Sequence, residues 1–561
     1  MLLFTKHKNL EPSLILIVLF ILISSIIILA LVPPVSRDAL IHHLAVPKIF
    51  LQHGSLCELP YLPFSYYPMN LDFLYMIPLY FGNDIIPKFI HFGFALLTAW
   101  LIYGYLKRRT SLTYALFGVV FFLSIPVIIK LSITVYVDLG VIFFSTAALL
   151  LLLRWIENGF LKRDLIYAAC MCGLAMGVKY NGLITFFLLS CLIPFYSSRY
   201  RQTGRLGTLK ILTSWFIFSL LALIMFSPWM IRNYYWKNNP IYPLYNKWFN
   251  HSRPIIIRSV NPQVIKKGKI GIFGYRNKAY NETWPQIALL PLRIFFQGRD
   301  GDPQYFDGKL NPFLLLLPIL AFYRLRDGPP AIQREKKILL IFSVLFFAFA
   351  FFSTALRIRY IAPVIPPLVI LAAYGLQNIR TILQKITLLK IEKTGPFLLI
   401  LFVLLSLGLN FRYLISQFNS VDPLPYLTGS IGRDDYITRY RPEYSAFKYI
   451  NKNVSEKSVI LFVFIGKRGY YCDREYIPDT GGQVKWLYGL VKKSRTPEDL
   501  LDHFARRSIT HLLISMPIFH EWVNDVFDME KLELLDRFFK QYLDLLYGEA
   551  GYSVFKLKST G

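Results

Sequence analysis

The sequence predicts an α-helical polytopic membrane protein with about eleven transmembrane helices, followed by a small C-terminal α/β domain. Of its 561 residues, 55% are hydrophobic, and they fall in long blocks rather than in amphipathic stripes. Blocks near about 20 residues are long enough to cross a bilayer. Basic clusters fall on alternate connections, as expected of cytoplasmic loops. Beyond residue 412 the apolar runs shorten to strand length, which indicates a soluble domain.

The first span is an uncharged run from Leu14 to Val32, preceded by Lys6 and Lys8. This run is longer than the apolar part of a signal peptide and no A-x-A cleavage pattern follows it, so we expect a retained anchor. The positive-inside rule then keeps the N-terminus cytoplasmic and places Asp38, just after the span, at the outer face.

The later apolar runs continue this alternation. We expect spans at residues 85–106, 111–129, 139–153, 165–178, 182–196, 211–231, 312–323, 338–356, 361–379 and 396–409. The outer loops are then 33–83, 130–138 and 232–311, within a transmembrane domain of residues 1–412. The net charge of +28 is explained by cytoplasmic loops, and no nucleic-acid recognition motif accompanies it.

Residues 413–561 form the expected soluble domain, which an odd number of crossings places outside. Residues 457–465 and 510–515 are typical of buried strands, and residues 497–507 and 529–542 of amphipathic helices. The end, YLDLLYGEAGYSVFKLK, predicts two strands around a turn.

Asp38 is the sharpest candidate for chemistry. A carboxylate at the membrane surface, followed one helical turn later by His42 and His43, suits a general base or a cation site. Two structural roles stay open: Ser36 or Asp38 as a helix N-cap, and the histidines as interfacial side chains.

A second acid, Asp138, begins an inward span, and it can equally serve as a cap for the helix from Leu139. Lys179, Arg357 and Arg359 lie on the expected outer side, against the usual charge bias. They favour an anionic ligand, phosphate above all, with snorkelling anchors as the alternative.

Other signatures are absent from the sequence. There is no P-loop or G-x-G-x-x-G motif, no H-E-x-x-H and no paired C-x-x-C. Cys57 and Cys472 fall on the expected outer side, where they are either paired or free.

The chain as a whole resembles the GT-C membrane glycosyltransferases, in particular the protein O-mannosyltransferase and lipid A aminoarabinose transferase group and its bacterial members. The segments that carry the resemblance are RDALIHHLAVPKIFLQHGSL (37–56), GLAMGVKYNGL (173–183), SPWMIRNYYWKNNPIYPLYN (227–246), RIRYIAPVIPPLVILAAYGL (357–376) and GKRGYYCDREYI (466–477).

The resemblance implies a transferase that uses a polyprenyl-phosphate-linked sugar at the outer face of the cytoplasmic membrane. Asp38 would deprotonate or position the acceptor hydroxyl, and Asp138 would support it or bind a divalent metal. The cations would hold the lipid phosphate. Many relatives have two adjacent acids in the first loop, whereas Ala39 follows Asp38 here, so His42 or His43 is a candidate substitute. The expected substrate-binding residues are His42, His43, Lys179, Arg357, Arg359 and Tyr67.

The hypothesis is therefore an inverting glycosyltransferase with Asp38 and Asp138 as catalytic residues. Its partners are a polyprenyl-phosphate sugar donor, membrane lipids and an acceptor glycan, lipid or protein, with no nucleic acid. The alternatives are a lipid-linked glycan transporter, a non-catalytic membrane assembly protein, or a soluble enzyme in the C-terminal domain. A transporter often has broken helices and internal repeats at mid-membrane, and the sequence indicates neither.

Overall fold

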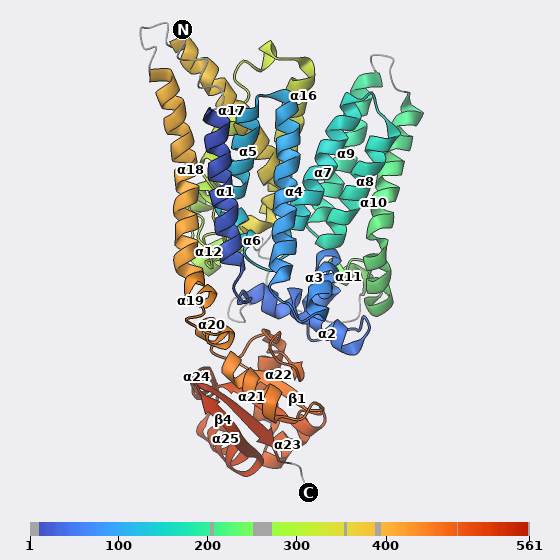
Figure 1. Ribbon diagram of the computed structural model, residues 1–561. Helices are drawn as coiled ribbons and strands as arrows, with labels where there is room; N and C mark the ends of the chain where they lie inside the picture. Colours follow the sequence, from blue (N-terminus) through green and yellow to red (C-terminus); the bar gives the residue numbers. More distant parts are fainter. Residues whose placement is uncertain are drawn as a thin grey trace.

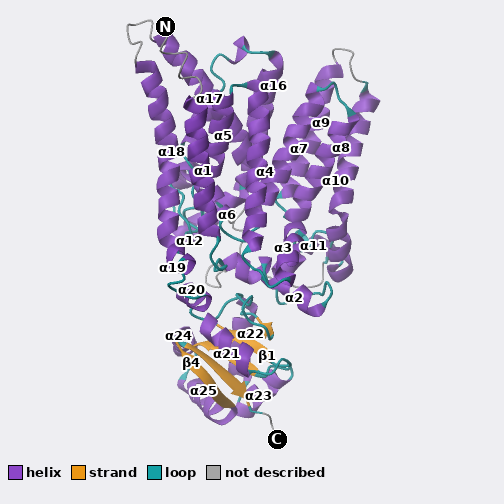
Figure 2. Cartoon of the chain, viewed as in Figure 1, coloured by secondary structure: helices purple, strands orange, loops and turns teal. Residues whose placement is uncertain are grey.

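The computed structural model describes residues 10–201, 207–250, 272–352, 356–386, 394–479 and 481–558. It is a bundle of long helices with a small α/β domain at one end (Figure 1). The strands that Figure 2 shows lie in that small domain. The expected cytoplasmic Lys6 and Lys8 lie outside the described residues.

The helices of the bundle follow the predicted spans. They are α1 (Leu10–Ala30), α4 (Ile86–Arg109), α5 (Leu112–Ser124), α6 (Pro126–Ser132), α7 (Asp138–Glu157), α8 (Lys162–Val178), α9 (Gly182–Arg201), α10 (Thr208–Lys237), α15 (Phe313–Leu320), α16 (Pro330–Phe351), α17 (Ile365–Ile386) and α18 (Thr394–Val421). Among the described residues, five helices are long and apolar enough to cross a membrane, or six if α5 and α6 count as one span. The expected number of eleven stays a prediction.

Two spans differ from expectation. The span expected at 111–129 is broken, because α5 and α6 meet at an angle of 66°. Ile125 at the break is extended, with a ψ of 131°, as the residue before a proline prefers. The span expected at 312–323 contains α15, whose 8 residues reach only about 12 Å, well short of the roughly 30 Å of a bilayer core.

The expected outer loops contain their own short helices, and these lie at the same end of the bundle as the small domain (Figure 1). The first loop holds a π-helical turn η1 (Ala39–His43), α2 (Ala45–His53), a 3-10 turn η2 (Pro63–Tyr66) and α3 (Asn70–Tyr80). The later loop holds α11 (Asn246–Phe249), α12 (Ile272–Tyr280), α13 (Trp284–Ala288) and α14 (Leu290–Phe296). Outside these loops, three 3-10 turns lie between the later helices of the bundle: η4 (Leu325–Asp327), η5 (Ile358–Tyr360) and η6 (Ala362–Val364).

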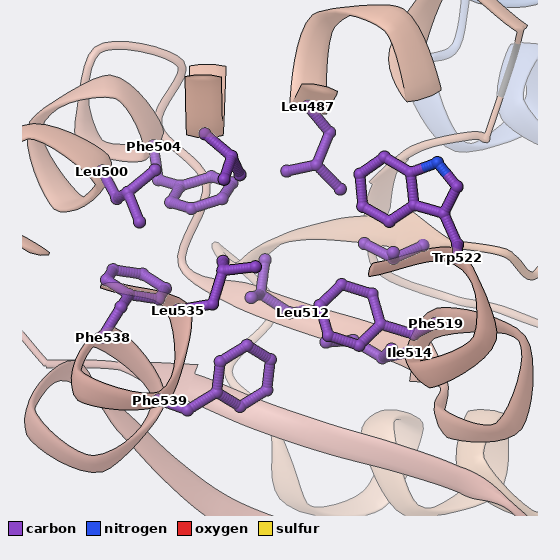
Figure 3. A pocket seen from close by; sticks show the side chains of 12 residues that line it. Leu487, Leu500, Phe504, Leu512, Ile514, Phe519, Trp522, Leu535, Phe538 and Phe539 are labelled. Carbon is purple, nitrogen blue, oxygen red and sulfur yellow. The ribbon is translucent and has the colours of Figure 1, made fainter. Parts of the chain in front are cut away.

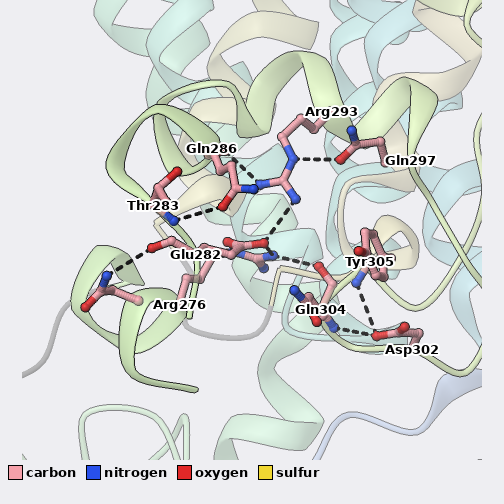
Figure 4. A network of polar contacts seen from close by, with 10 residues as sticks. Arg276, Glu282, Thr283, Gln286, Arg293, Gln297, Asp302, Gln304 and Tyr305 are labelled. Atoms are coloured by element: carbon pink, nitrogen blue, oxygen red, sulfur yellow. Dashed lines mark hydrogen bonds and ion pairs between the residues drawn. The ribbon is translucent and has the colours of Figure 1, made fainter. Parts of the chain in front are cut away.

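A polar network fixes the later loop (Figure 4). Arg276 donates from Nε and Nη2 to the two carboxylate oxygens of Glu282, at 2.5 and 2.7 Å. Arg293 reaches the same carboxylate at 3.1 Å. Both side chains of the first pair are nearly inaccessible. These two arginines therefore stabilise the loop and are not free to bind an anion.

The small domain is a five-stranded mixed sheet in the order β2-β1-β3-β5-β4. Its strands are β1 (Val459–Val463), β2 (Glu475–Ile477), β3 (His511–Ser515), β4 (Leu543–Glu549) and β5 (Tyr552–Leu557). Strand β1 runs parallel to β2 and β3, and β5 is antiparallel to β3 and β4. The helices are α19 (Pro423–Leu427), α20 (Arg433–Tyr440), α21 (Tyr444–Asn453), α22 (Gly481–Lys493), α23 (Pro497–Ala505), α24 (Met516–Val526) and α25 (Met529–Tyr542).

Both faces of this sheet are covered. Apolar side chains of α22 to α25 pack on one face and those of α21 on the other, so the alternating strands and helices are confirmed as an α/β domain. Figure 3 shows the first of these cores, where the ring of Phe504 faces that of Phe538 and the ring of Phe519 faces that of Phe539. The cavity there measures about 20 Å³, close to the size of one water, which indicates packing rather than a ligand site. Helix α18 runs through the expected domain boundary at residue 413 and ends at Val421.

Candidate active site

Asp38 lies at the turn between α1 and η1 and faces an arginine from far along the chain. Its carboxylate Oδ2 accepts from Arg359 Nη1 at 2.5 Å, and the side chains of the acid and the arginine are 20% and 11% exposed. Burial alone raises the pKa of Asp38, but the adjacent Arg359 charge reverses this and leaves the pKa below its ordinary value. The backbone of Asp38 is already helical and its side chain makes no capping bond, so the N-cap role is wrong for it.

The second acid forms a parallel arrangement. Asp138, the first residue of α7, accepts from Lys179 Nζ at 2.6 Å, and its side chain is only 4% exposed. Its other carboxylate oxygen, Oδ2, is buried and has no hydrogen-bond partner among the described residues. Lys179 follows the end of α8 and is held there because a charge at that depth needs a partner.

A tyrosine joins the two acid–base pairs. The Lys179 ammonium lies 5.0 Å from the Tyr360 ring centroid, and the Arg359 guanidinium lies 5.4 Å from it. Asn181 donates to the Tyr360 carbonyl at 3.1 Å. The structure thus brings together Asp38, Asp138, Lys179 and Arg359, four of the residues expected from sequence.

His42 and His43 also lie here, with different partners. The His43 Nδ1 is 2.7 Å from Asp72 Oδ1, and both side chains are buried. Burial raises the pKa of Asp72 to about 8 and lowers that of His43 to about 3, so burial favours the uncharged form of both groups. His42 instead stacks on Phe64, with ring centroids 4.6 Å apart. Sequence reasoning missed Asp72, because nothing local marks an acid inside an apolar helix as a partner of His43.

Three buried polar atoms of this site have no hydrogen-bond partner within the described part of the protein: His42 Nδ1, Asp138 Oδ2 and Arg359 Nε. Buried polar atoms are nearly always paired in folded proteins. Their concentration around the two acid–base pairs marks the place where a polar ligand or water fits.

Arg357, two residues before Arg359, is oriented elsewhere. Its Nη1 lies 3.2 Å from Asp307 Oδ2, and Asp307 in turn lies 3.7 Å from Lys130. The structure therefore does not bring Arg357 to the carboxylate of Asp38.

Tyr67 lies among aromatic rings beside the site, 5.3 Å from Tyr180 and 5.5 Å from Phe64 between centroids. Its carbonyl accepts from Arg232 Nη2 at 3.1 Å. The Arg232 guanidinium carbon lies 4.6 Å from the centroid of the Trp229 ring and 5.0 Å from that of the Trp236 ring, and among the described residues Arg232 has no carboxylate partner. Sequence analysis missed this arginine, although the motif SPWMIRNYYW contains it.

The small domain supports the segment that carries Asp38. The Tyr471 hydroxyl donates to the Pro34 carbonyl at 2.8 Å, and the Tyr470 amide donates to the Leu40 carbonyl at 3.2 Å. Lys48 Nζ donates to the Tyr470 carbonyl at 2.7 Å. A compact apolar cluster containing Ala39, Leu40 and Tyr470 joins η1 to the domain. Cys472 in the same loop is a free thiol, as is Cys57, so they form no disulfide.

A metal site is not evident from the side chains. Within the described ranges, no group of three or more His, Cys, Asp or Glu side chains is arranged to hold a metal ion. The two central acids are each engaged by a cation. We therefore assign no step to a metal.

Two kinds of comparison relate the chain to known proteins. Residues 85–232 match the family model of dolichyl-phosphate-mannose-protein mannosyltransferases, a stretch that includes Asp138, Lys179 and Arg232. No curated protein sequence gives a significant match.

Three solved structures share the fold over nearly the whole chain. ArnT from Cupriavidus metallidurans bound to undecaprenyl phosphate has a TM-score of 0.55 and 14% identity, covering 99% of each chain. Its apo structure has a TM-score of 0.55 and 13% identity, covering 97% of each. The oligosaccharyltransferase from Archaeoglobus fulgidus with a tethered acceptor peptide has a TM-score of 0.54 and 10% identity, covering 99% of this chain and 75% of the other. The family model thus matches one part of the chain, and the solved structures show that the chain shares their overall fold.

Proposed function

We propose that this protein transfers a sugar from a polyprenyl-phosphate-linked donor to an acceptor at the outer face of the cytoplasmic membrane, with Asp38 as the catalytic base. The observation that carries the proposal is the meeting of two ion pairs, Asp38 with Arg359 and Asp138 with Lys179, around one tyrosine ring. The same end of the bundle holds the loop of residues 33–83, which we expect to be an outer loop, and the small domain (Figure 1).

In the proposed reaction the acceptor hydroxyl oxygen attacks the anomeric carbon of the donor sugar while the bond from that carbon to the phosphate oxygen breaks. The phosphate leaves with the electron pair, and Asp38 takes the hydroxyl proton. Attack opposite the leaving group inverts the anomeric centre. Asp38 is ionised before the reaction because Arg359 lowers its pKa, and an ionised carboxylate is the form that accepts a proton.

The leaving phosphate requires positive charge. Lys179 and Arg359 are already paired with acids. Their positive charges are therefore partly neutralised by Asp138 and Asp38 before a ligand binds. Arg232 is the cation at the end of α10 without a carboxylate partner among the described residues, and its Trp229 and Trp236 neighbours fix its plane. We assign the donor phosphate to Arg232 with Lys179 and Arg359, in place of Arg357, because planar guanidinium groups match phosphate oxygens well.

The test compares purified wild type with Asp38→Asn on a panel of polyprenyl-phosphate sugars, following transfer to membrane lipid and protein fractions. We expect transfer to fall by about 100-fold or more, the usual contribution of a general base, with the affinity for the donor lipid retained. Asp307→Asn is the matched control, because Asp307 also pairs with an arginine, but this arginine is Arg357 rather than the Arg359 that pairs with Asp38.

Equal transfer by wild type and Asp38→Asn would disprove the catalytic role. If neither protein transfers or hydrolyses any donor and both bind the lipid equally, the transport or assembly function is correct instead.

A further inference from the structure

Arg232 at the end of α10 is held by uncharged hydrogen-bond acceptors. Its Nε and Nη2 both donate to one oxygen, Asn233 Oδ1, at 3.1 and 2.9 Å. Nη2 also donates to the Tyr67 carbonyl at 3.1 Å. The remaining nitrogen, Nη1, makes no hydrogen bond within the described part of the chain. One edge of the guanidinium is therefore fixed, while another is left for a ligand.

Asn233 is itself fixed by its surroundings. Its side chain is completely buried, at 0% exposure. Its Nδ2 donates to the Tyr66 carbonyl at 2.9 Å, to Tyr180 Oη at 3.0 Å and to the Tyr242 carbonyl at 3.3 Å. The nitrogen of an amide side chain donates and its oxygen accepts. These three acceptors therefore require the oxygen of Asn233 to face Arg232.

The same contacts join Arg232 to the lysine of the second acid–base pair. Tyr180 directly follows Lys179 in the chain, and its ring lies 5.3 Å from the ring of Tyr67 between centroids. Helix α10 ends at the same end of the bundle as α3, α11 and the small domain (Figure 1). Asn233 thus bonds both to Arg232 and to the turn that carries Lys179, so it sets how the two cations lie relative to each other.

An asparagine at this position orients the arginine without neutralising it. An aspartate would have the same shape, but it would form a two-point ion pair with the guanidinium. The acid that reaches this network, Glu58, accepts from Tyr66 Oη at 2.6 Å and is paired with Lys237. Its charge is therefore already engaged, and the charge of Arg232 stays available to an anion.

We propose that Asn233 is a positioning residue for the donor phosphate, which orients the Arg232 guanidinium while leaving its full charge to the phosphate. This inference rests on the proposed glycosyltransferase function. Preorganised donors bind an anion without the cost of reorienting a flexible side chain. A carboxylate at position 233 would instead occupy the guanidinium in place of the phosphate.

The experiment measures equilibrium binding to the full-length protein in dodecyl maltoside micelles, which carry no phosphate. The probes are a polyprenyl phosphate and the uncharged polyprenol of the same chain length, and the measured quantity is the ratio of their dissociation constants. The variants are Asn233→Asp, Asn233→Leu, Arg232→Gln and Arg232→Gln with Asn233→Leu. The matched control is Asn239→Asp. Asn239 is an equally buried asparagine just beyond α10, and its Nδ2 donates to the Leu244 carbonyl at 3.0 Å.

We expect wild type and Asn239→Asp to bind polyprenyl phosphate about tenfold or more tightly than polyprenol, as hydrogen bonds to a charged group predict. Asn233→Asp should lose most of this preference and keep its affinity for polyprenol. Asn233→Leu should lose only part of it, because the guanidinium is no longer oriented but keeps its charge. In the Arg232→Gln background, Asn233→Leu should cause no further loss, because Asn233 acts through that guanidinium.

An undiminished preference in Asn233→Asp overturns the proposal. An equal loss in Asn239→Asp would show that any buried carboxylate disturbs this region, and it also overturns the proposal. If Asn233→Asp fails to fold in thermal unfolding measurements, the leucine variants decide: a loss of preference that is equally large without Arg232 shows a structural role and overturns it. Equal binding of the two lipids by wild type would refute the assignment of the phosphate to Arg232. Failure of the proposed function is seen separately, as absent sugar transfer with the lipid preference intact.

Discussion

Replacing Arg359 by glutamine tests how the site keeps Asp38 ionised. Burial raises the pKa of Asp38, and the guanidinium at 2.5 Å outweighs it. Glutamine preserves a hydrogen-bond donor but removes the charge. An arginine beside an aspartate lowers the pKa of the acid by about 1 to 3 units, which corresponds to roughly 1.4 to 4 kcal/mol. Without that charge the burial effect dominates, and the pKa of Asp38 rises above its ordinary value.

The consequence appears in the pH dependence of sugar transfer. Wild type should keep its kcat/KM nearly constant down to about pH 5, because Asp38 titrates well below that range. In Arg359→Gln, kcat/KM should fall on the acid side with an apparent pKa of about 5 to 7. The absolute rate should fall as well, because Arg359 is also assigned to the leaving phosphate, so the position of the acid limb is the informative quantity.

Arg357→Gln is the control. It removes the same charge two residues before Arg359, and the Arg357 guanidinium pairs with Asp307 rather than with Asp38. Its acid limb should match that of wild type. The reasoning is refuted if the two variants have the same acid limb while both remain folded in thermal unfolding measurements.

Three further outcomes are expected. Tyr471→Phe removes one hydrogen bond to the segment before Asp38 and should lower the unfolding free energy by about 1 kcal/mol. Sugar transfer should fall more than in the control Lys457→Gln, which removes an exposed cation of the small domain. Unchanged transfer by Tyr471→Phe would argue against a supporting role. Lys179→Gln leaves the buried Asp138 carboxylate unpaired and should destabilise the protein by about 3 to 5 kcal/mol. Adding Asp138→Asn should restore most of the lost stability in a double-mutant cycle. Additive losses of stability would contradict the pairing of the two residues. Asp72→Asn removes an acid whose folded pKa is about 8, above its unfolded value of about 3.9. Wild-type stability is lost as pH rises through that window, so the unfolding temperature of the variant should rise relative to that of wild type between about pH 5 and 8. A difference in unfolding temperature that does not change with pH would contradict the raised pKa of Asp72.

Much of the fold is encoded locally. Apolar runs of span length become long helices because the bilayer fixes how many residues a crossing needs. In the small domain, the helix expected at residues 529–542 is observed as α25 with the same bounds, because its amphipathic period is a property of neighbouring residues. Strand β2 was missed, since its 3 residues are too short to give a pattern.

The acids and cations of the site could be named from sequence because charged residues at the ends of apolar runs are rare and costly. Asp38, Asp138, Lys179 and Arg359 were found in this way. Arg357 satisfied the same criterion and yet pairs with Asp307, because in a tight turn residues two apart point in different directions. Sequence therefore identified the charged groups, but it did not distinguish those that meet from those that do not.

Only the tertiary structure decided the partners. Asp38 and Arg359 are 321 residues apart, and the bond from Lys48 to the Tyr470 carbonyl spans 422. Composition and periodicity indicate whether a side chain is buried and in which element it lies, since burial and secondary structure both depend on neighbouring residues in the sequence. Which charge meets which depends on how the helices pack and on where the small domain docks, and that choice is a property of the whole chain.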